Sequence, residues 1–418
     1  MRRLLAVSWE MPPMYGPRAT QVARTLGALM PLGWQPTVVC LDPRRGGPNW
    51  PDGRDVAPPA GVETIRVKSP EEWTIVRALW RLAPALRDRP DSKWVWINRA
   101  AAVARSAAER TSFDGLVTFA QPWSDHLVGL RVHRATKLPW VAHFSDPWID
   151  SPYWSGSRSQ RAAAATMEAD VIRDATAVVF VTDEAADLVM RKYPDEWRGK
   201  VAVVPHGFVA PLPMPALKGP AYREEAQPLR LVYTGRFYDG VRTPDRLFRA
   251  IAALNAEEPL DGVMELTCVG PFVTGFAHQA KSLGIDRLVR LKDKVSSGDA
   301  QSMAAGADVL IVIDAPSDGP SPFLPSKLVD YLPLRKPILG LTPASGASAA
   351  LLTRLGGVVA APGDDAGIGA ALRDLLRRWR EGALAVGPDY DRVAAEYDIA
   401  KTTAVLNDVL GRAFGRST

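Results

Sequence analysis

Short apolar runs alternate with helical patterns along the whole chain. Six runs come first, RLLAVSW, QPTVVCL, GLVTF, WVAHF, AVVFVT and VAVVPHG, and six follow, LRLVYTG, MELTCVG, LVRLKD, ADVLIVID, KPILGLT and GGVVAA. Continuously apolar runs are typical of strands that are buried on both faces of a parallel sheet. The helical patterns between them supply the crossovers that cover such a sheet. The pattern predicts an α/β protein in which each half is a doubly wound unit.

A proline-rich segment separates the two sets of runs. Residues 208–228 read FVAPLPMPALKGPAYREEAQP and show no apolar period, which is typical of a stiff connector. We therefore expect domains over residues 1–208 and 229–395, joined by a linker over 209–228. The last segment, about 396–418, has the apolar spacing of an amphipathic helix. Its pattern suits a helix that caps the second domain or one that crosses back to the first.

Composition excludes several classes of protein. The 418 residues are 47% hydrophobic and 23% charged, with a net charge of +5, as in a folded globular chain. The first apolar run is too short for a signal peptide, and no run approaches the roughly 20 residues that cross a bilayer. We therefore expect a cytoplasmic protein. Cys40 and Cys268 lie in separate apolar runs, so buried thiols are expected and a disulfide is not.

Familiar phosphate and metal motifs are missing from the sequence. It lacks G-x-G-x-x-G after the first strand, G-x-x-x-x-G-K-[ST], the G-x-S-x-G elbow and the H-E-x-x-H spacing. No metal site is therefore expected. The first strand leads instead into a loop with Gly16, just before a helix that begins near Ala19. A glycine there lets an anionic group approach the helix amides, with a simple Gly16-Pro17 turn as the alternative.

The second half repeats this layout with two arginines. In YTGRFYDGVRTPDRLFRAI a strand ends at Gly235, and Arg236 and Arg242 follow before a helix begins near Pro244. Guanidinium groups bind phosphate oxygens through paired donors. The pair predicts a diphosphate clamp, with two solvated loop arginines as the alternative.

The stretch LPSKLVDY combines a hydroxyl, an ammonium and a carboxylate at a predicted helix start. Proline is favoured in the first turn, so a start near Pro325 puts Ser326 and Lys327 at the N-terminus, where phosphate oxygens bind. Asp330 follows about one turn later and suits a ribose diol. The stretch predicts a site for a nucleoside diphosphate. Ordinary N-capping by Ser326 would explain that residue alone.

A basic stretch with interleaved tryptophans runs from Arg66 to Arg110. It holds ten basic and five acidic residues and four tryptophans. Such a stretch suits contact with anionic lipid head groups or a lipid-linked acceptor, or stacking against acceptor sugars. A helical hairpin packed in the core is the alternative. Nucleic acid is not expected as a partner, because no recognition motif accompanies the charge.

Seven segments in order along nearly the whole chain resemble the retaining glycosyltransferases of family 4, which have the GT-B fold. They are SWEMPPMYGPRATQVARTL, GWQPTVVCL, LPWVAHFSDPW, VVFVTDEAADLVMRKYP, VAVVPHGF, YTGRFYDGVRTPDRLFRAI and LPSKLVDYLPLRKPILGLTP. The resemblance implies two Rossmann-like domains facing across a cleft, with an acceptor site on the N-terminal one. It also implies a nucleotide-sugar donor held mainly by the C-terminal domain, a final helix that crosses back, and no metal or other cofactor.

The resemblance also implies roles for individual residues. The donor-binding residues would be Gly16, Arg236, Arg242, Ser326, Lys327 and Asp330. The glycine would face the donor diphosphate, the cations and the serine would bind its oxygens, and the aspartate would bind the ribose. His143 and Asp146 in HFSDPW would line the donor-sugar pocket near the reacting carbon. A turn at a strand end is the alternative for that segment.

One position departs from the family pattern. Family members commonly carry two glutamates, and the second one binds the ribose. Here Asp330 stands at the second position and Pro322 at the first. The residue that often contacts the donor sugar is therefore missing.

The sequence thus predicts a retaining, metal-independent glycosyltransferase of carbohydrate biosynthesis, bacterial by its excess of arginine over lysine. Its donor would be a nucleotide-diphosphate sugar, and its acceptor a glycan, a lipid-linked hydroxyl or a small molecule. The acceptor would attack from the front face, and the leaving diphosphate would help to deprotonate it. The enzyme would be cytoplasmic, with a peripheral position at the inner membrane face as a variant. A GT-B sugar-nucleotide epimerase and a non-catalytic GT-B partner protein, which Pro322 permits, stay open as alternatives.

Overall fold

The computed structural model describes most of the chain. The described residues are 1–14, 16–44, 57–70, 73–82, 90–154, 156–209, 227–238, 240–271, 273–293, 295, 297–317 and 319–415. Most of the predicted linker, residues 210–226, lies outside them, as do residues 71–72 and 83–89 of the basic stretch.

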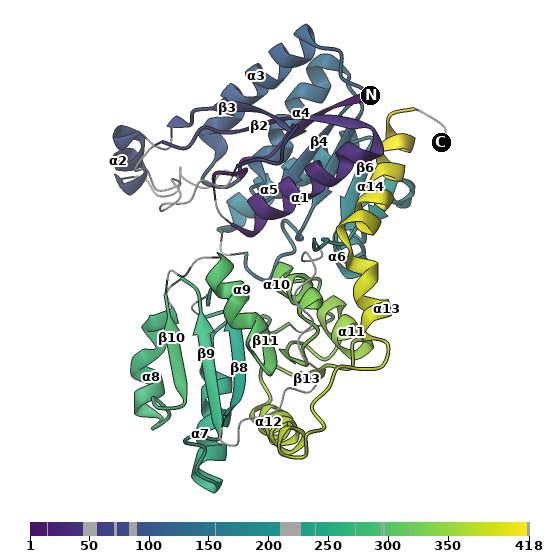
Figure 1. Cartoon of the computed structure of the whole chain (residues 1–418). Coiled ribbons are helices and arrows are strands. Elements are labelled where there is room, and N and C mark those ends of the chain that lie inside the picture. Colours follow the sequence, from purple (N-terminus) through teal and green to yellow (C-terminus); the bar gives the residue numbers. More distant parts are fainter. Residues whose placement is uncertain are drawn as a thin grey trace. The chain divides into compact units, whose positions relative to one another are not determined.

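The chain divides into two compact units. One comprises Met1–Val209 with Asp398–Thr418, and the other comprises Ala210–Tyr397. Each unit contains one sheet of parallel strands with helices packed on it (Figure 1). The predicted α/β class, with two doubly wound units, is confirmed.

The first unit has a seven-stranded sheet in the order β3-β2-β1-β4-β5-β6-β7. Its strands are β1 (Arg2–Val7), β2 (Trp34–Leu41), β3 (Glu63–Val67), β4 (Gly115–Ala120), β5 (Trp140–Phe144), β6 (Ala177–Phe180) and β7 (Val201–Val203). Its α-helices are α1 (Pro17–Leu29), α2 (Thr74–Leu82), α3 (Ile97–Arg110), α4 (Ser124–Thr136), α5 (Arg158–Asp174), α6 (Asp183–Met190) and α14 (Ile399–Ala413).

Side chains of the central strand β1 alternate between two apolar cores. Leu4 and Ala6 pack with α1 and α14, whereas Leu5 and Val7 pack with α3 and α4 on the other face. All four side chains are fully buried. This two-sided burial explains why the strand reads as a continuous apolar run, without alternation of polar residues.

The last helix, α14, belongs to the unit that begins the chain. Oδ1 of Asn407 accepts hydrogen bonds from Arg2 Nη2 at 3.0 Å and from Trp34 Nε1 at 2.9 Å. Where the helix begins, the Ile399 N–H donates to the Phe208 carbonyl at 2.9 Å. The helix is therefore fixed by polar contacts as well as by its apolar face.

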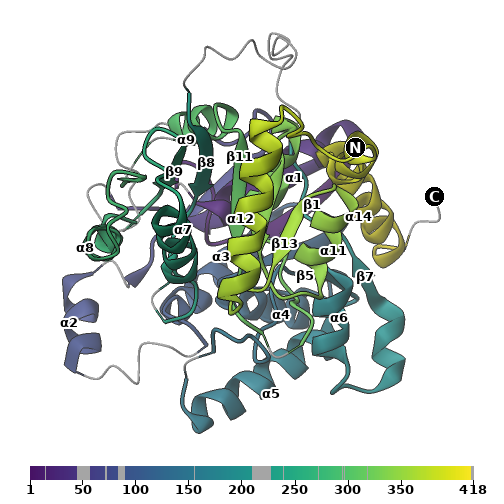
Figure 2. The same ribbon diagram turned by 90° about the horizontal axis from the view of Figure 1, so that it is seen from below.

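The second unit has a six-stranded sheet in the order β10-β9-β8-β11-β12-β13. Its strands are β8 (Leu229–Thr234), β9 (Met264–Val269), β10 (Val289–Lys292), β11 (Val309–Ile313), β12 (Ile338–Leu341) and β13 (Val358–Ala360). Its α-helices are α7 (Asp245–Glu257), α8 (Ala277–Ser282), α9 (Ser297–Ala305), α10 (Ser326–Tyr331), α11 (Ala347–Arg354), α12 (Asp365–Arg380) and α13 (Tyr390–Ala394). Figure 2 shows α7 and α12 side by side, and both pack in the core of this unit.

Three further expectations bear on the chemistry. Cys40 and Cys268 are free and fully buried, as the sequence predicts. Among the described residues, no helix is long and apolar enough to span a membrane. The same residues contain no group of three His, Cys, Asp or Glu side chains arranged to hold a metal ion.

Replacing Asn407 by alanine should destabilise the first unit, because the buried Trp34 indole N–H loses its acceptor. Loss of such a partner costs about 1–3 kcal/mol. We expect urea unfolding, followed by tryptophan fluorescence, to shift to lower urea in Asn407→Ala. Val405→Ala is the matched control, since Val405 is 47% exposed on the same helix. Equal shifts in the two variants would contradict the role given to Asn407.

Candidate functional site

Six of the eight candidate residues follow strands at which the strand order reverses. The order reverses between β1 and β4 in the first unit and between β8 and β11 in the second. Ligands of doubly wound sheets bind at such reversals. Gly16 follows β1, Arg236 and Arg242 follow β8, and the segment with Ser326 and Lys327 follows β11. The topology thus brings predicted residues from distant segments to the same sheet edge within each unit.

Lys327 lies across the end of β8. Its Nζ donates a hydrogen bond to the Tyr233 hydroxyl at 3.0 Å and lies 4.2 Å from the centre of that ring. A Cβ at Gly235 would lie 1.9 Å from this Nζ, and the φ of Gly235 is +141°, so the position requires glycine. Burial lowers the pKa of Lys327 well below its usual value, and the positive charge of Arg242 adds a smaller effect in the same direction. A bound anion would oppose this shift by favouring the charged ammonium.

Two arginines are at the same strand end. Arg242 Nη2 donates to the Arg236 carbonyl at 3.2 Å, and the Tyr233 hydroxyl donates to the same oxygen at 3.0 Å. The guanidinium groups of Arg236 and Arg242 lie 5.5 Å and 4.8 Å from the centre of the Tyr238 ring. Nε of Arg242 is buried and has no hydrogen-bond partner within the described part of the chain. The second unit therefore gathers three basic side chains, and one of them, Arg242, has a buried donor that could bind a ligand.

Helix α10 begins at Ser326, directly after Pro325, where the sequence places its start. The helix has six residues, so we attribute most of the positive potential to the side-chain cations rather than to its dipole. Asp330 is half-buried on this helix. The next residue, Tyr331, accepts a hydrogen bond from the Thr234 N–H at 2.9 Å, which ties the helix to the end of β8. Because Lys327 is on the same helix, this hydrogen bond also helps to position the lysine.

A buried carboxylate that the sequence analysis missed supports this cluster. Asp314 directly follows β11, is 1% exposed, and accepts hydrogen bonds from the hydroxyls of Ser348, Thr342 and Ser321 at 3.1, 3.4 and 3.5 Å. Burial raises the pKa of Asp314, and the Ser348 hydrogen bond and the Arg242 charge oppose the rise. Because Ser321 precedes α10, these bonds hold the loop that presents the helix. The sequence signal was an acidic residue at the end of the apolar run ADVLIVID.

His143 lies near the end of β5 in the first unit and is 6% exposed. Its ring centre lies 5.3 Å from that of Phe119 and 6.3 Å from that of His206. Burial is the main reason why the pKa of His143 is lowered to about 3, and the positive charge of Arg18 adds to the effect. The imidazole is therefore neutral near pH 7, with one nitrogen that donates and one that accepts.

Asp146 follows β5 and is half-buried. Its Oδ2 accepts a hydrogen bond from Gln121 Nε2 at 3.3 Å and lies 3.3 Å from Ser145 Oγ. The Ser145 hydroxyl donates to the Ala120 carbonyl at 2.8 Å, which joins the ends of β4 and β5. Asp146 is thus held at the strand end that also carries His143.

The N-terminus of α1 already has a carboxylate beside it. Glu10 accepts a hydrogen bond from the Ala19 N–H, and a Cβ at Gly16 would lie 2.9 Å from its Oε2. The φ of Gly16 is 172°, an extended conformation that any residue adopts, so only this close approach favours glycine. Glu10 therefore occupies a place that the sequence analysis assigned to a diphosphate. A phosphate bound there would compete with it.

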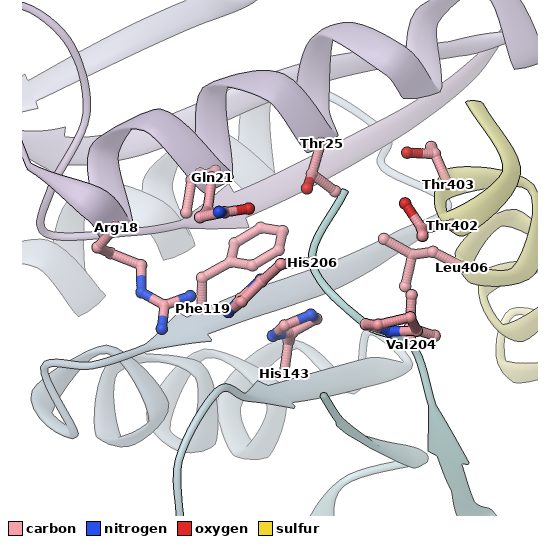
Figure 3. Close-up of a pocket in the computed structure, with 12 residues that line it drawn as sticks. Arg18, Gln21, Thr25, Phe119, His143, Val204, His206, Thr402, Thr403 and Leu406 are labelled. Atoms are coloured by element: carbon pink, nitrogen blue, oxygen red, sulfur yellow. The ribbon is translucent and has the colours of Figure 1, made fainter. Parts of the chain in front are cut away.

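Arg18 is a further residue to which no role was assigned from the sequence. Burial lowers its pKa, and the charges of Asp146, Glu10 and Asp125 oppose the shift. Its Nε is buried without a hydrogen-bond partner among the described residues. Figure 3 shows Arg18 beside His143 and His206 at a small pocket. Arg18 is far from β5 in the sequence, so its place near the end of that strand is visible only in the folded chain.

Residues 18–207 match the family model of the glycosyl transferase 4-like domain. The match runs from the first turn of α1 to the segment after β7. It confirms the resemblance to family 4 glycosyltransferases in this part of the chain. No curated protein matches the chain in sequence.

Solved structures share the fold over nearly the whole chain. Sucrose-phosphate synthase from Thermosynechococcus elongatus has a TM-score of 0.73 at 15% identity, with 99% of each chain covered. Anabaena Alr3699/HepE, solved in complex with UDP, has a TM-score of 0.66 at 15% identity and covers 99% of this chain and 100% of its own. WaaG, a glycosyltransferase involved in lipopolysaccharide biosynthesis, has a TM-score of 0.63 at 16% identity, with 97% and 99% covered. At these identities the likeness establishes the fold, and it confirms the GT-B class.

The buried His143 should make the first unit sensitive to acid. Its pKa falls from 6.5 to about 3 on folding, so between these values the unfolded chain binds a proton that the folded chain does not. The stabilisation is complete above pH 6.5 and is lost as the pH falls toward 3, by up to about 1.4 kcal/mol per pH unit. His143→Asn should therefore flatten the pH dependence of urea unfolding below pH 6.5. The control is His278→Asn, at an exposed position, and an unchanged slope in His143→Asn would contradict the assignment.

Proposed function

Because residues 18–207 match a glycosyl transferase 4-like domain and the whole chain has the GT-B fold, we propose that this protein is a retaining glycosyltransferase. The observation that carries the proposal is the group of Lys327, Arg236 and Arg242 around Gly235 at the end of β8. Charged donors of this kind, at a strand end kept open by a glycine, suit the oxygens of a diphosphate.

The donor would be a nucleotide-diphosphate sugar bound along α10. The Ser326 hydroxyl and the Lys327 ammonium would bind phosphate oxygens, and the Asp330 carboxylate would accept hydrogen bonds from the ribose diol. UDP is the first nucleotide to test, because Anabaena Alr3699/HepE was crystallised with UDP and with UDP-glucose.

In the proposed reaction, the bond between the anomeric carbon and the diphosphate oxygen breaks. A bond from this carbon to the acceptor oxygen forms on the same face of the sugar, and the leaving diphosphate takes the acceptor proton. Lys327, Arg236 and Arg242 stabilise the charge that develops on the leaving group, as preorganised cations do. We infer that they supply the stabilisation that a metal ion supplies in other enzymes.

The first unit would bind the hydroxyl-bearing groups. His143 is neutral, so it can orient a sugar hydroxyl without adding charge near the anomeric carbon. Asp146 would accept a hydrogen bond from a second hydroxyl. Hydrogen bonds hold Asp146 at the end of β5, and burial confines His143 there, which is the property that such a role requires.

A non-catalytic nucleotide-binding protein is the second candidate, and Pro322 is the observation that favours it. Pro322 is buried and offers no carboxylate to a sugar. The two candidates differ in one result. An enzyme releases nucleoside diphosphate from its sugar donor over time, whereas a non-catalytic protein binds the donor and leaves it intact.

The first unit also carries an exposed apolar helix suited to a membrane-linked acceptor. Trp73 is 47% exposed, and Ile75 and Leu82 on α2 are 68% and 83% exposed. Arg81 is exposed on the same helix, and the Arg99 guanidinium lies 5.5 Å from the centre of a Trp73 ring. In both views α2 stands apart from the rest of its unit (Figures 1 and 2). We propose that α2 docks on anionic lipid head groups.

Calorimetric titration of UDP, GDP, ADP and their sugars should identify one preferred nucleotide. Lys327→Ala should weaken its binding by roughly tenfold or more, because a charge-assisted hydrogen bond contributes about 1.5–3 kcal/mol. Lys281→Ala, at an exposed lysine of α8, is the matched control and should bind as the wild type does. Asp330→Ala should bind the ribonucleotide and its 2′-deoxy form equally. Absence of binding to every nucleotide would refute the proposed donor site.

Sedimentation with vesicles of phosphatidylglycerol and phosphatidylcholine tests the proposed membrane contact. We expect binding that weakens with rising salt and that falls in the double variant Ile75→Ser and Leu82→Ser, because apolar area and charge both contribute. Val405→Ser, at an exposed apolar site on α14, should bind as the wild type does. Equal binding of all three proteins would show that α2 is not the contact.

A further inference from the structure

Glu168 is a fully buried carboxylate on α5, in the same unit as Asp146. Its Oε2 accepts a hydrogen bond from the Ile149 N–H at 3.1 Å. Its Oε1 accepts one from the Tyr193 hydroxyl at 2.7 Å and lies 2.8 Å from Lys192 Nζ. A glutamate is almost never fully buried unless it is paired, and these three partners meet that need. The carboxylate therefore joins α5 to the loop after β5 and to the segment after α6.

The loop after β5 is anchored on both sides of Asp146. On one side, the Ser145 hydroxyl donates to the Ala120 carbonyl at 2.8 Å. On the other side, Glu168 holds the Ile149 N–H, which is three residues after Asp146 in the sequence. The chain between the two anchors is short, so a shift at Ile149 would be transmitted to Asp146.

The two residues that follow Asp146 leave this loop little freedom. Pro147 has a fixed φ, and it also restricts the backbone of the residue before it, which is Asp146. Trp148 is 1% exposed, and its ring stacks on that of Trp123, with the ring centres 4.9 Å apart and the planes at 4°. A stiff segment of this kind carries the effect of its far anchor to the carboxylate of Asp146.

We propose that Glu168 is a positioning residue for the transfer reaction, because it fixes the loop that presents Asp146 to a hydroxyl group. The inference rests on the proposed function for the role of Asp146. The hydrogen bond from Ile149 to Glu168 is a property of the folded chain, and it can be tested without any substrate. A glutamate with a purely structural role would stabilise the unit and leave the kcat of the folded protein unchanged.

The two oxygens of Glu168 allow a matched pair of variants. Glu168→Met keeps the length of the side chain and removes both oxygens. Tyr193→Phe is the control, because it removes a donor to Oε1 and leaves Oε2 for the Ile149 N–H. Each variant loses a hydrogen bond of the cluster, so both should unfold at lower urea than the wild type. Glu168→Gln retains one acceptor oxygen and should restore part of the lost rate.

Transfer kinetics separate positioning from stability. Glu168→Met should lower kcat by roughly tenfold, since misplacing a group at an active site costs up to about 10²-fold. The KM for the donor should change little, because the proposed diphosphate site lies in the second unit. Tyr193→Phe should keep the kcat of the wild type, although it is less stable.

A double-mutant cycle with Asp146 tests the route of the effect. In the Asp146→Ala background, Glu168→Met should lower kcat no further, because a residue that acts through another has no separate effect once that residue is gone. The same fold-loss of kcat in both backgrounds would overturn the proposal.

Hydrogen exchange at the Ile149 amide tests the anchor itself. The amide can be observed by ¹⁵N-isoleucine labelling and identified by its absence in Ile149→Val. Exchange should be slow in the wild type and in Tyr193→Phe, and roughly tenfold or more faster in Glu168→Met. Fast exchange in the wild type would overturn the proposal.

Two further outcomes are distinguishable. If Glu168→Met does not fold, Glu168→Gln carries the comparison, and its exchange rate at Ile149 and its kcat should change together. A change in one of them alone would overturn the proposal. Slow exchange at Ile149 without transfer by the wild type from any donor would refute the proposed function and leave the anchor confirmed.

Discussion

The close approach of the Lys327 ammonium to the backbone of Gly235 is the constraint on which the donor site depends. A side chain at position 235 would overlap the ammonium and would have to adopt a φ of +141°, so the strand end must stay bare. The Tyr233 hydroxyl accepts from Lys327 and donates to the Arg236 carbonyl, so one hydroxyl fixes the lysine and the arginine loop together. Three basic side chains from two distant segments are thus in place before a ligand binds. Charge that is already oriented needs little reorganisation when a leaving group develops negative charge.

The first unit differs from the second, because its buried arginine lies near carboxylates rather than near other basic groups. Arg18 lies in the field of three carboxylates, those of Asp146, Glu10 and Asp125, and Glu10 accepts a backbone hydrogen bond at the start of α1. The histidine nearest to this charge, His143, is held neutral. This balance suits hydroxyl groups better than a second anion. We therefore propose that the second unit binds the diphosphate and that the first unit presents His143 and Asp146 to uncharged hydroxyl groups.

The sequence predicted those features that depend on local pattern. Continuous apolar runs gave both parallel sheets, and glycine, proline and the basic residues marked the strand end at Gly235 and the helix start at Ser326. It missed Asp314, Glu10 and Arg18, because their roles come from tertiary contacts. Asp314 accepts hydrogen bonds from hydroxyls up to 34 residues away in the sequence. The charges that raise the pKa of Arg18 come from three other residues, Asp146, Glu10 and Asp125. Gly16 is a further example. The spacing of the sequence predicted a helix start there, but it could not show that the Glu10 carboxylate already lies beside that helix start.

The most direct test of this account is a crystal structure of the whole chain with the nucleoside diphosphate that it binds best. The account predicts phosphate oxygens within hydrogen-bond distance of Lys327 Nζ and the Arg242 guanidinium, with the ribose beside Asp330. A diphosphate bound elsewhere, for example at the start of α1 with Glu10 displaced, would contradict it.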